Sequence, residues 1–207
     1  MYVDNKIYLL YGDGMQNKIH KRIKDISEVI FGYTFRSTLK EQADGDVLVL
    51  QARNIIEDII IKNSDLIKVD LGNNRTNALA KNNDVVLSSR GSFKSAVIQI
   101  DSGTVVAASS VYLLRLKTDK VLPEYLAIYL NSNFAQRQIN EKITGVVINA
   151  MLKKDVEELE IIIPSLETQK KAVTIYFNNL RHQKLLRQKQ LLTNQINQEL
   201  INQLIKY

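Results

Sequence analysis

The C-terminal stretch from Ser165 to Tyr207 contains neither glycine nor proline, and this feature constrains the fold more than any other. Pro164 precedes the stretch, and the Ser165 side chain can cap the free N–H groups of a first helical turn. The stretch predicts one continuous helix, which at about 1.5 Å per residue would span roughly 60 Å. Because a domain of this size is narrower than that, the helix must extend beyond its own domain or run beside another helix.

Two apolar stripes follow one another along the predicted helix. The first ends at Leu180 and the second begins at Leu185, and a step of five residues rotates the apolar face around the helix axis. We expect the first stripe to pack on the preceding domain and the second to meet another helix, because an exposed stripe is unfavourable in water. The alternative is a helix that folds back on its own domain. The second stripe consists of Leu185, Leu192, Ile196, Leu200 and Leu204.

Composition narrows the class of protein. A chain of 207 residues can form one domain with an extension, or two small domains. The absence of cysteine excludes a disulfide scaffold and a cysteine-ligated metal or cysteine nucleophile. No signal peptide is apparent at the N-terminus, and no stretch reaches the roughly 18 apolar residues of a membrane span. We therefore expect a cytoplasmic protein with no membrane partner.

The net charge of +6 is unevenly distributed. From Leu166 onward the sequence holds seven Lys or Arg against two Glu, a net charge of +5. Residues 1–165 carry 21 basic and 20 acidic residues, a net charge of +1. Charge alone therefore does not identify the preceding domain as DNA-binding.

Short apolar runs between turn residues predict strands in the first half of the chain. They cover residues 46–50, 55–61, 84–87, 96–100 and 105–116, with a hairpin turn expected at residues 101–103. Residues 21–30 show the spacing of a brief amphipathic helix, and residues 32–36 and 70–75 read as loops. The pattern favours a mixed, curved sheet or a partial barrel.

The period changes at Pro123, a residue suited to the first turn of a helix. Helices are predicted over residues 123–130, 134–143 and 149–158, followed by a strand over residues 160–163. The predicted fold class is therefore α+β: a mixed, curved sheet with short helices, followed by one long C-terminal helix.

Residue types typical of catalysis are sparse. The only histidines, His20 and His182, lie in unrelated segments, and no glycine-rich phosphate loop is present. Glu57, Asp58 and Lys62 resemble a nuclease cluster only faintly, and a plain surface strand is the better interpretation. We expect no enzyme activity, no catalytic residue, no metal site and no cofactor.

Polar, basic loops are the remaining candidates for function. Hydroxyl, amide and guanidinium groups in such loops can contact phosphates and base edges, and a glycine allows close backbone approach. Each loop taken singly could be an ordinary hydrophilic connection, but together they favour DNA binding. The candidate DNA-binding residues are Thr34, Arg36, Arg75, Asn77, Arg90, Ser92, Lys94, Thr144, Asn149 and Lys153.

Several segments resemble the specificity (S) subunit of type I restriction–modification systems. Residues 163–170, Ile-Pro-Ser-Leu-Glu-Thr-Gln-Lys, are similar to the start of that family's spacer helix. Residues 21–36, 84–91 and 126–130 are similar to parts of its target-recognition domain, and the likeness covers about residues 20–207. The family's usual subunit has two recognition domains and two helices that pair antiparallel, whereas this chain has one of each. The resemblance therefore implies a half-length form.

The resemblance implies a non-catalytic DNA-specificity subunit with residues 1–164 as recognition domain, residues 1–19 unassigned, and residues 165–207 as spacer helix. Its partners would be double-stranded DNA, methyltransferase (M) subunits and a restriction (R) subunit. A second copy, paired through the second stripe in an antiparallel coiled coil, would restore the symmetric layout. Two rivals stay open: a coiled-coil protein-interaction module without DNA recognition, and the recognition region of a single-chain restriction–methylation enzyme.

Overall fold

The short apolar runs of the central sequence form the strands of two sheets. The structure is a computed structural model that describes residues 19–36, 38–55, 58–72, 76–143 and 150–206. The chain forms two compact units, residues 1–170 and residues 171–207, and each is described by itself. The domain boundary expected at residue 164 stays a prediction.

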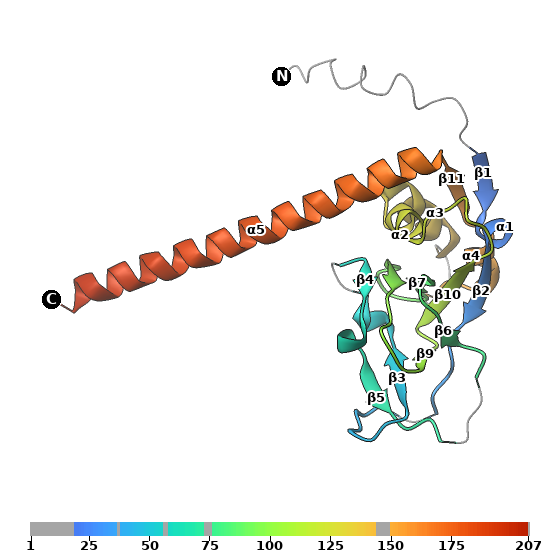
Figure 1. Ribbon diagram of the computed structural model, residues 1–207, viewed down its shortest axis with the longest axis horizontal. Helices are drawn as coiled ribbons and strands as arrows, with labels where there is room; N and C mark the ends of the chain where they lie inside the picture. The colour runs from blue at the N-terminus through green and yellow to red at the C-terminus, as the bar shows by residue number, and fades with distance from the viewer. Residues whose placement is uncertain (1–18, 37, 56–57, 73–75, 144–149, 207) are drawn as a thin grey trace, which may run out of the picture. The chain divides into compact units, whose positions relative to one another are not determined.

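A five-stranded sheet occupies the centre of the first unit (Figure 1), in the order β2-β10-β7-β8-β4. Its pairs are antiparallel except for β4 and β8, which run parallel. The residues of β7 alternate between two core clusters, because neighbouring side chains of a strand point to opposite faces. The sheet is therefore buried on both faces. Its strands are β2 (Ser27–Phe31), β4 (Ile60–Ile61), β7 (Val85–Ser88), β8 (Ser95–Ile98) and β10 (Val111–Leu116).

A four-stranded sheet, in the order β5-β3-β9-β6, contributes to the core on one of these faces. Its strands β3 and β9 run parallel, so the first unit is a mixed structure. Leu50 of β3 and Val105 of β9 share a core cluster with Val86 and Leu113 of the five-stranded sheet. The strands are β3 (Val47–Leu50), β5 (Ile67–Val69), β6 (Leu79–Ala80) and β9 (Val105–Ala107), with 3-10 turns η2 (Ala52–Asn54) and η3 (Asn63–Asp65) nearby.

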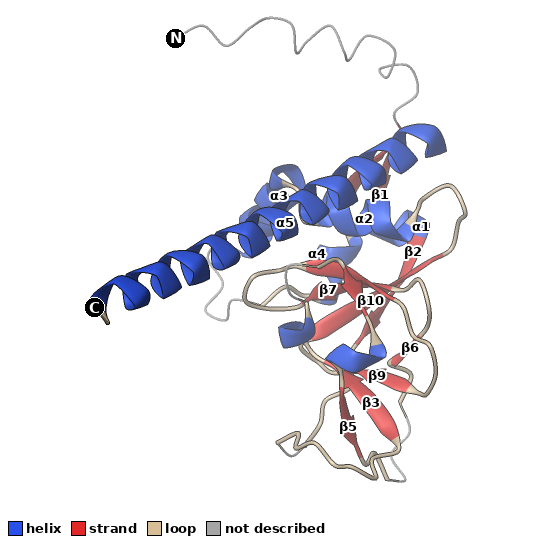
Figure 2. Ribbon diagram, turned by 60° about the vertical axis from the view of Figure 1, so that its left-hand side comes forward, coloured by secondary structure: helices blue, strands red, loops and turns tan. Residues whose placement is uncertain are grey.

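Helices α2 (Pro123–Leu130) and α3 (Asn133–Ile143) lie on the other side of the five-stranded sheet (Figure 2). Leu126 and Leu130 of α2 and Ile139 of α3 are fully buried in the cluster that contains Val85 and Leu87. Pro123 occupies the first turn of α2, as its fixed φ favours. The α+β fold class with mixed sheets, short helices and a long C-terminal helix is confirmed.

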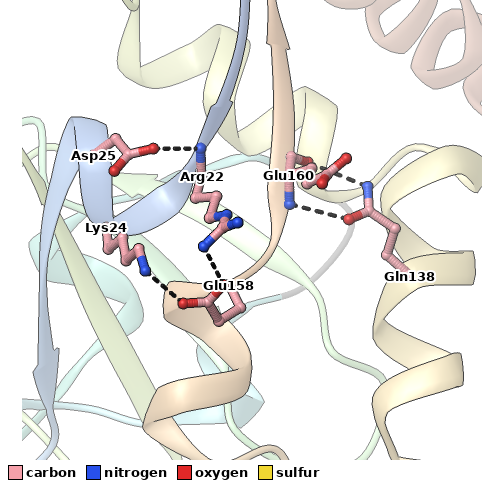
Figure 3. Close-up of polar contacts among 6 residues, drawn as sticks. All are labelled: Arg22, Lys24, Asp25, Gln138, Glu158 and Glu160. Carbon is pink, nitrogen blue, oxygen red and sulfur yellow. Dashed lines mark hydrogen bonds and ion pairs between the residues drawn. The ribbon is translucent and has the colours of Figure 1, made fainter.

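A two-stranded sheet pairs β1 (Ile19–Arg22) with β11 (Glu160–Ile163), strands from opposite ends of the described part of the first unit. Arg22 and Lys24 both pair with Glu158, at 2.9 and 2.6 Å (Figure 3). On the other edge of β11, the Gln138 side chain hydrogen-bonds both the N–H and the carbonyl of Glu160. These contacts fix β11, from which the chain continues into the long helix.

Two expectations near the N-terminus and in the second half need correction. The helix expected over residues 21–30 is wrong for most of its length: only α1 (Ile23–Ile26) is helical, because the flanking residues pair in β1 and β2 with distant strands. The helix expected over residues 149–158 shortens to α4 (Lys153–Glu157). Isolated short helices are weak, so strand pairing prevails over the helical pattern.

Three expectations in the β-rich part are also wrong. Residues 105–116 form β9 and β10, separated by a turn at Ala108–Ser110, because the two strands belong to different sheets. For the same reason residues 101–103 are not a hairpin turn: β8 and β9 do not pair. Of the strand expected over residues 55–61, β4 keeps only Ile60 and Ile61, and residues 56–57 lie outside the described residues.

The long helix α5 runs from Leu166 to Ile205, as the absence of glycine and proline predicts. Ser165 caps it: its Oγ accepts a hydrogen bond from the Thr168 N–H at 3.3 Å. Gln169 is fully buried, accepts the Leu122 N–H at 2.9 Å, and donates to the carbonyls of Lys120 and Pro164 at 2.8 and 2.9 Å. The first turn of α5 is thus anchored within the first unit. No helix among the described residues could cross a membrane.

A partly buried ion pair joins β10 to the residue before β7, and its arginine also reaches the four-stranded sheet. Arg115 of β10 binds the Asp84 carboxylate through two nitrogens, at 3.0 and 2.7 Å, and also donates to the carbonyl of Leu79 in β6 at 2.8 Å. The hydrogen bond to Asp84 raises the pKa of Arg115, so its charge is retained. Asp84 is almost fully buried, so its carboxylate depends on this partner.

We expect Arg115→Leu to lower the free energy of unfolding by about 3 kcal/mol, because it leaves the Asp84 carboxylate buried without its counter-ion. Urea denaturation of the whole chain measures the loss. Lys24→Met is the matched control: it removes a cation from the exposed pair with Glu158 and should leave the midpoint nearly unchanged. Equal losses in both variants would contradict the role of the partly buried pair.

Candidate nucleic-acid interface

The hairpin between β7 and β8 presents three of the candidate residues. Its closing rung is the hydrogen bond from the Ser88 N–H to the Lys94 carbonyl, at 2.9 Å. Arg90, Ser92 and Lys94 are exposed, whereas Phe93 is 3% exposed and belongs to the core. Gly91 has a φ of 79°, a conformation that favours glycine. The loop therefore points its basic and hydroxyl residues to solvent around one buried anchor.

Backbone hydrogen bonds join this hairpin to two other segments. The Met151 N–H donates to the Ser89 carbonyl at 2.9 Å, and Arg90 forms an isolated antiparallel β-bridge with Ala150. On the other side, the Ser89 N–H donates to the Ser110 carbonyl at 2.8 Å. Segments far apart in the sequence thus meet at the end of β7.

Backbone hydrogen bonds also join the segment that follows β2 to the turn between β9 and β10. The Tyr33 N–H donates to the Ala107 carbonyl at 2.7 Å, and the Ser109 N–H donates to the Tyr33 carbonyl at 2.8 Å. Gly32 permits this approach, because a Cβ there would lie 1.9 Å from the Ala108 carbonyl oxygen. We call residues 33–36, 89–94, 108–110 and 150–153 the loop cluster.

Seven of the ten candidate DNA-binding residues lie on or beside the loop cluster. Thr34, Arg36, Arg90, Ser92, Lys94 and Lys153 belong to its segments, and all six are exposed. Asn77 is also exposed, and the carbonyl of the next residue, Ala78, accepts the Ala107 N–H at 2.9 Å. The remaining candidates, Arg75, Thr144 and Asn149, lie outside the described residues.

The electrostatics of the loop cluster favour a polyanion. Among ion pairs formed within the part of the chain that the structure describes, none involves Arg36, Arg90 or Lys94. Lys153 pairs loosely with Glu157 at 3.7 Å. Such cations can contact phosphates, while hydroxyl and amide groups beside them can contact base edges. In the described residues, no group of His, Asp or Glu could hold a metal ion.

Several residues that hold the loop cluster together cannot be selected from the sequence. The Tyr112 hydroxyl donates to the Met151 carbonyl at 2.8 Å, and burial raises the pKa of Tyr112, with Asp155 adding to the rise and Arg90 opposing it. Ser89 Oγ donates to the Ser109 carbonyl at 3.1 Å. A glycine at position 32, between two aromatic residues, is the one signal of close backbone approach that the sequence offers.

A model of a known protein family matches this sequence. The family model described as "Type I restriction modification DNA specificity domain" matches residues 15–202, which is most of the chain. The resemblance drawn from residues 163–170 and the recognition-domain segments is therefore confirmed. No curated protein matches this sequence.

Solved structures share the fold at low sequence identity. A structure from a study of type I R-M complex assembly and conformational transition is 19% identical, with a TM-score of 0.60 over 83% of this chain and 40% of that chain. The HsdS subunit from Thermoanaerobacter tengcongensis is 18% identical, with a TM-score of 0.57 over 83% of this chain and 39% of that chain.

The type IIG restriction endonuclease BpuSI is 11% identical, with a TM-score of 0.54 over 82% of this chain and 27% of that chain. At these identities the likeness is one of fold. The matched region spans at most 40% of the length of each of these three chains.

Proposed function

Because the chain belongs to the family of type I restriction–modification DNA specificity domains, we propose that it is a half-length specificity subunit that selects the DNA target of such a complex. The observation that carries the proposal is the loop cluster, in which backbone contacts gather exposed Arg, Lys, Ser and Thr side chains from distant segments. In this role the chain recognises DNA in the cytoplasm and leaves methylation and cleavage to its partner chains.

Recognition divides between two kinds of contact. Lys and Arg side chains of the loop cluster neutralise phosphates and set the affinity, with the salt dependence that counter-ion release imposes. Guanidinium, hydroxyl and amide groups read base edges in the major groove. We assign both roles to the candidate residues as a group, with Arg90 as the first candidate for base readout, because it follows the hydrogen-bonded Ser89 directly.

We propose that two copies pair through the second stripe of α5. Its five members, each more than half exposed in the single chain, form an apolar face that a second helix would bury. An isologous pair about a twofold axis uses the same stripe from both copies, and an antiparallel coiled coil satisfies that symmetry. Each dimer then carries two identical recognition domains.

The polar surface of α5, with its net positive charge, is the proposed binding surface for a methyltransferase subunit, and a restriction subunit joins the same complex. We expect the whole chain to co-purify with that methyltransferase, and a chain that ends at Lys170 to lose it. The truncation keeps Gln169, whose hydrogen bonds anchor residues 166–170 in the first unit.

A second variant makes this experiment decisive. The whole chain with Ile196→Asp and Leu200→Asp keeps the polar surface, so it separates loss of the helix from loss of pairing. Full recovery of the methyltransferase with the truncated chain would contradict the proposed surface. DNA binding that weakens with salt would exclude a coiled-coil module without DNA recognition.

The second candidate function is the recognition region of a single-chain restriction–methylation enzyme. The likeness in fold to the type IIG endonuclease BpuSI favours it, because the matched region is only 27% of that chain. A methyltransferase on a separate polypeptide that co-purifies with this chain would decide for the half-length subunit.

A further inference from the structure

The hairpin loop of residues 89–94 is held from the helical side of the sheet as well as from the loop cluster. Asn131, which ends α2, hydrogen-bonds both backbone groups of Ser95: it accepts the Ser95 N–H at 2.9 Å and donates to the Ser95 carbonyl at 2.8 Å. Gln136, near the start of α3, donates to the Phe93 carbonyl at 3.0 Å. Side chains at the junction of α2 and α3 thus hold the backbone of the hairpin at Phe93 and at Ser95.

The hairpin backbone at Phe93 is in an unfavourable conformation. Phe93 has a φ of 48°, in the left-handed region that bulky residues rarely adopt. Such a conformation persists only where the surroundings impose it. Here the Phe93 ring is buried in the core and its carbonyl is bound by Gln136, so the neighbours of the loop maintain its shape.

Asn131 and Gln136 are themselves held in place by hydrogen bonds to α2. The Asn131 N–H donates to the Ala127 carbonyl at 3.1 Å, as the final turn of α2 requires. Gln136 Nε2 also donates to the Leu130 carbonyl at 2.7 Å, which ties α3 to the end of α2. Both side chains therefore act from rigid elements, and rigid elements hold a binding group more accurately than loops do.

We infer that Asn131 and Gln136 are positioning residues for sequence readout: they fix Ser92 and Lys94, on either side of Phe93, and Arg90 in one arrangement against the base edges. This inference rests on the proposed function of the loop cluster. Base contacts require accurate donor and acceptor positions, whereas contacts to phosphates tolerate displacement. Loss of the hydrogen bonds from Asn131 and Gln136 to the hairpin should therefore reduce sequence discrimination more than general affinity for DNA.

The test uses the whole chain and a pool of duplexes randomised over about three helical turns. The enriched motif is determined for each variant, together with the ratio of its affinity to that of the unselected pool. We expect Asn131→Ala and Gln136→Met to lower this ratio about tenfold. Affinity for the unselected pool should stay within about twofold of the unsubstituted chain.

The matched control is Gln138→Ala. Gln138 also bonds both backbone groups of one residue, Glu160, but on a different strand (Figure 3). It should lose thermal stability to a similar extent as Asn131→Ala and keep the ratio. Asn131→Asp, which still accepts the Ser95 N–H but cannot donate to the Ser95 carbonyl, should give an intermediate ratio.

The possible outcomes distinguish failure of the positioning role from failure of the proposed DNA recognition. An unsubstituted chain that enriches no motif would overturn the proposed DNA recognition itself. An unsubstituted chain that enriches a motif, while both variants enrich the same motif at the same ratio, would overturn the positioning role alone. Gln136→Met leaves the hydrogen bonds of Asn131 in place, so it decides the question even where Asn131→Ala does not fold.

Discussion

The double substitution Ile196→Asp with Leu200→Asp should yield a monomer that no longer directs methylation. The two residues lie one helical turn apart in the second stripe and are 60% and 53% exposed in the single chain. In an antiparallel pair the substitution would place four carboxylates in the apolar seam, where each unpaired charge costs several kcal/mol. We expect the dissociation constant of the dimer to rise at least about a thousandfold, which corresponds to about 4 kcal/mol.

Sedimentation measures the oligomeric state, and methylation of host DNA measures function. The matched control is Gln195→Glu with Asn197→Asp, which adds the same charge to two exposed positions that flank Ile196 outside the stripe. This control should remain dimeric, because both substitutions lie outside the stripe. A monomeric unsubstituted chain in the presence of methyltransferase, or a charged-stripe variant that still directs methylation, would contradict dimer pairing.

Arg90→Ala combined with Lys94→Ala should weaken specific DNA binding at both recognition domains, or heads, of the proposed dimer. We expect a base-reading Arg to account for about 1–3 kcal/mol of discrimination per head. Removal of a phosphate-binding Lys should reduce the salt slope by about one for each phosphate that the variant no longer neutralises. Titrations of a target duplex and an unrelated duplex at several salt concentrations separate these two effects.

The control for this pair is Lys62→Ala with Lys68→Ala, which removes two exposed cations outside the loop cluster. It should leave specific affinity nearly unchanged. An Arg90 and Lys94 double variant with unaltered affinity and unaltered methylation would remove the hairpin from the DNA-binding site.

Local signals in the sequence predict the elements that depend on local interactions. The missing glycine and proline predict α5, Pro123 predicts α2, and the apolar run after Asp84 predicts β7. The failures concern elements that depend on distant partners. β1 pairs with β11, which follows it by well over a hundred residues. No local pattern in residues 19–22 predicts that pairing.

The division of residues 105–116 between two sheets is a similar case. The apolar run is continuous in character, and only the assignment of β9 to one sheet and β10 to the other shows why it must turn at residues 108–110. That turn then supplies Ser109 and Ser110 to the loop cluster. The local error in secondary structure thus concealed part of the candidate site.

The composition of the loops predicted candidate DNA-binding residues but not their arrangement. The segments that carry Arg36, Arg90 and Lys153 are joined through backbone hydrogen bonds of Tyr33, Ser89 and Met151, residues whose side chains gave no reason to select them. Asn131 and Gln136 are similar: their role follows from contacts with Ser95 and Phe93, which the sequence does not indicate. The assignment of individual DNA contacts stays a prediction.

Methylome sequencing of cells with and without this chain tests the central claim most directly. Two identical recognition domains related by a twofold axis must read inverted copies of one short sequence. In the proposed dimer, antiparallel helices of roughly 60 Å would place the half-sites one to two turns of DNA apart. We predict that methylation dependent on this chain occurs at a bipartite palindrome with an unspecified spacer. A non-palindromic methylation motif, or a methylome that does not change when the chain is removed, would contradict the account.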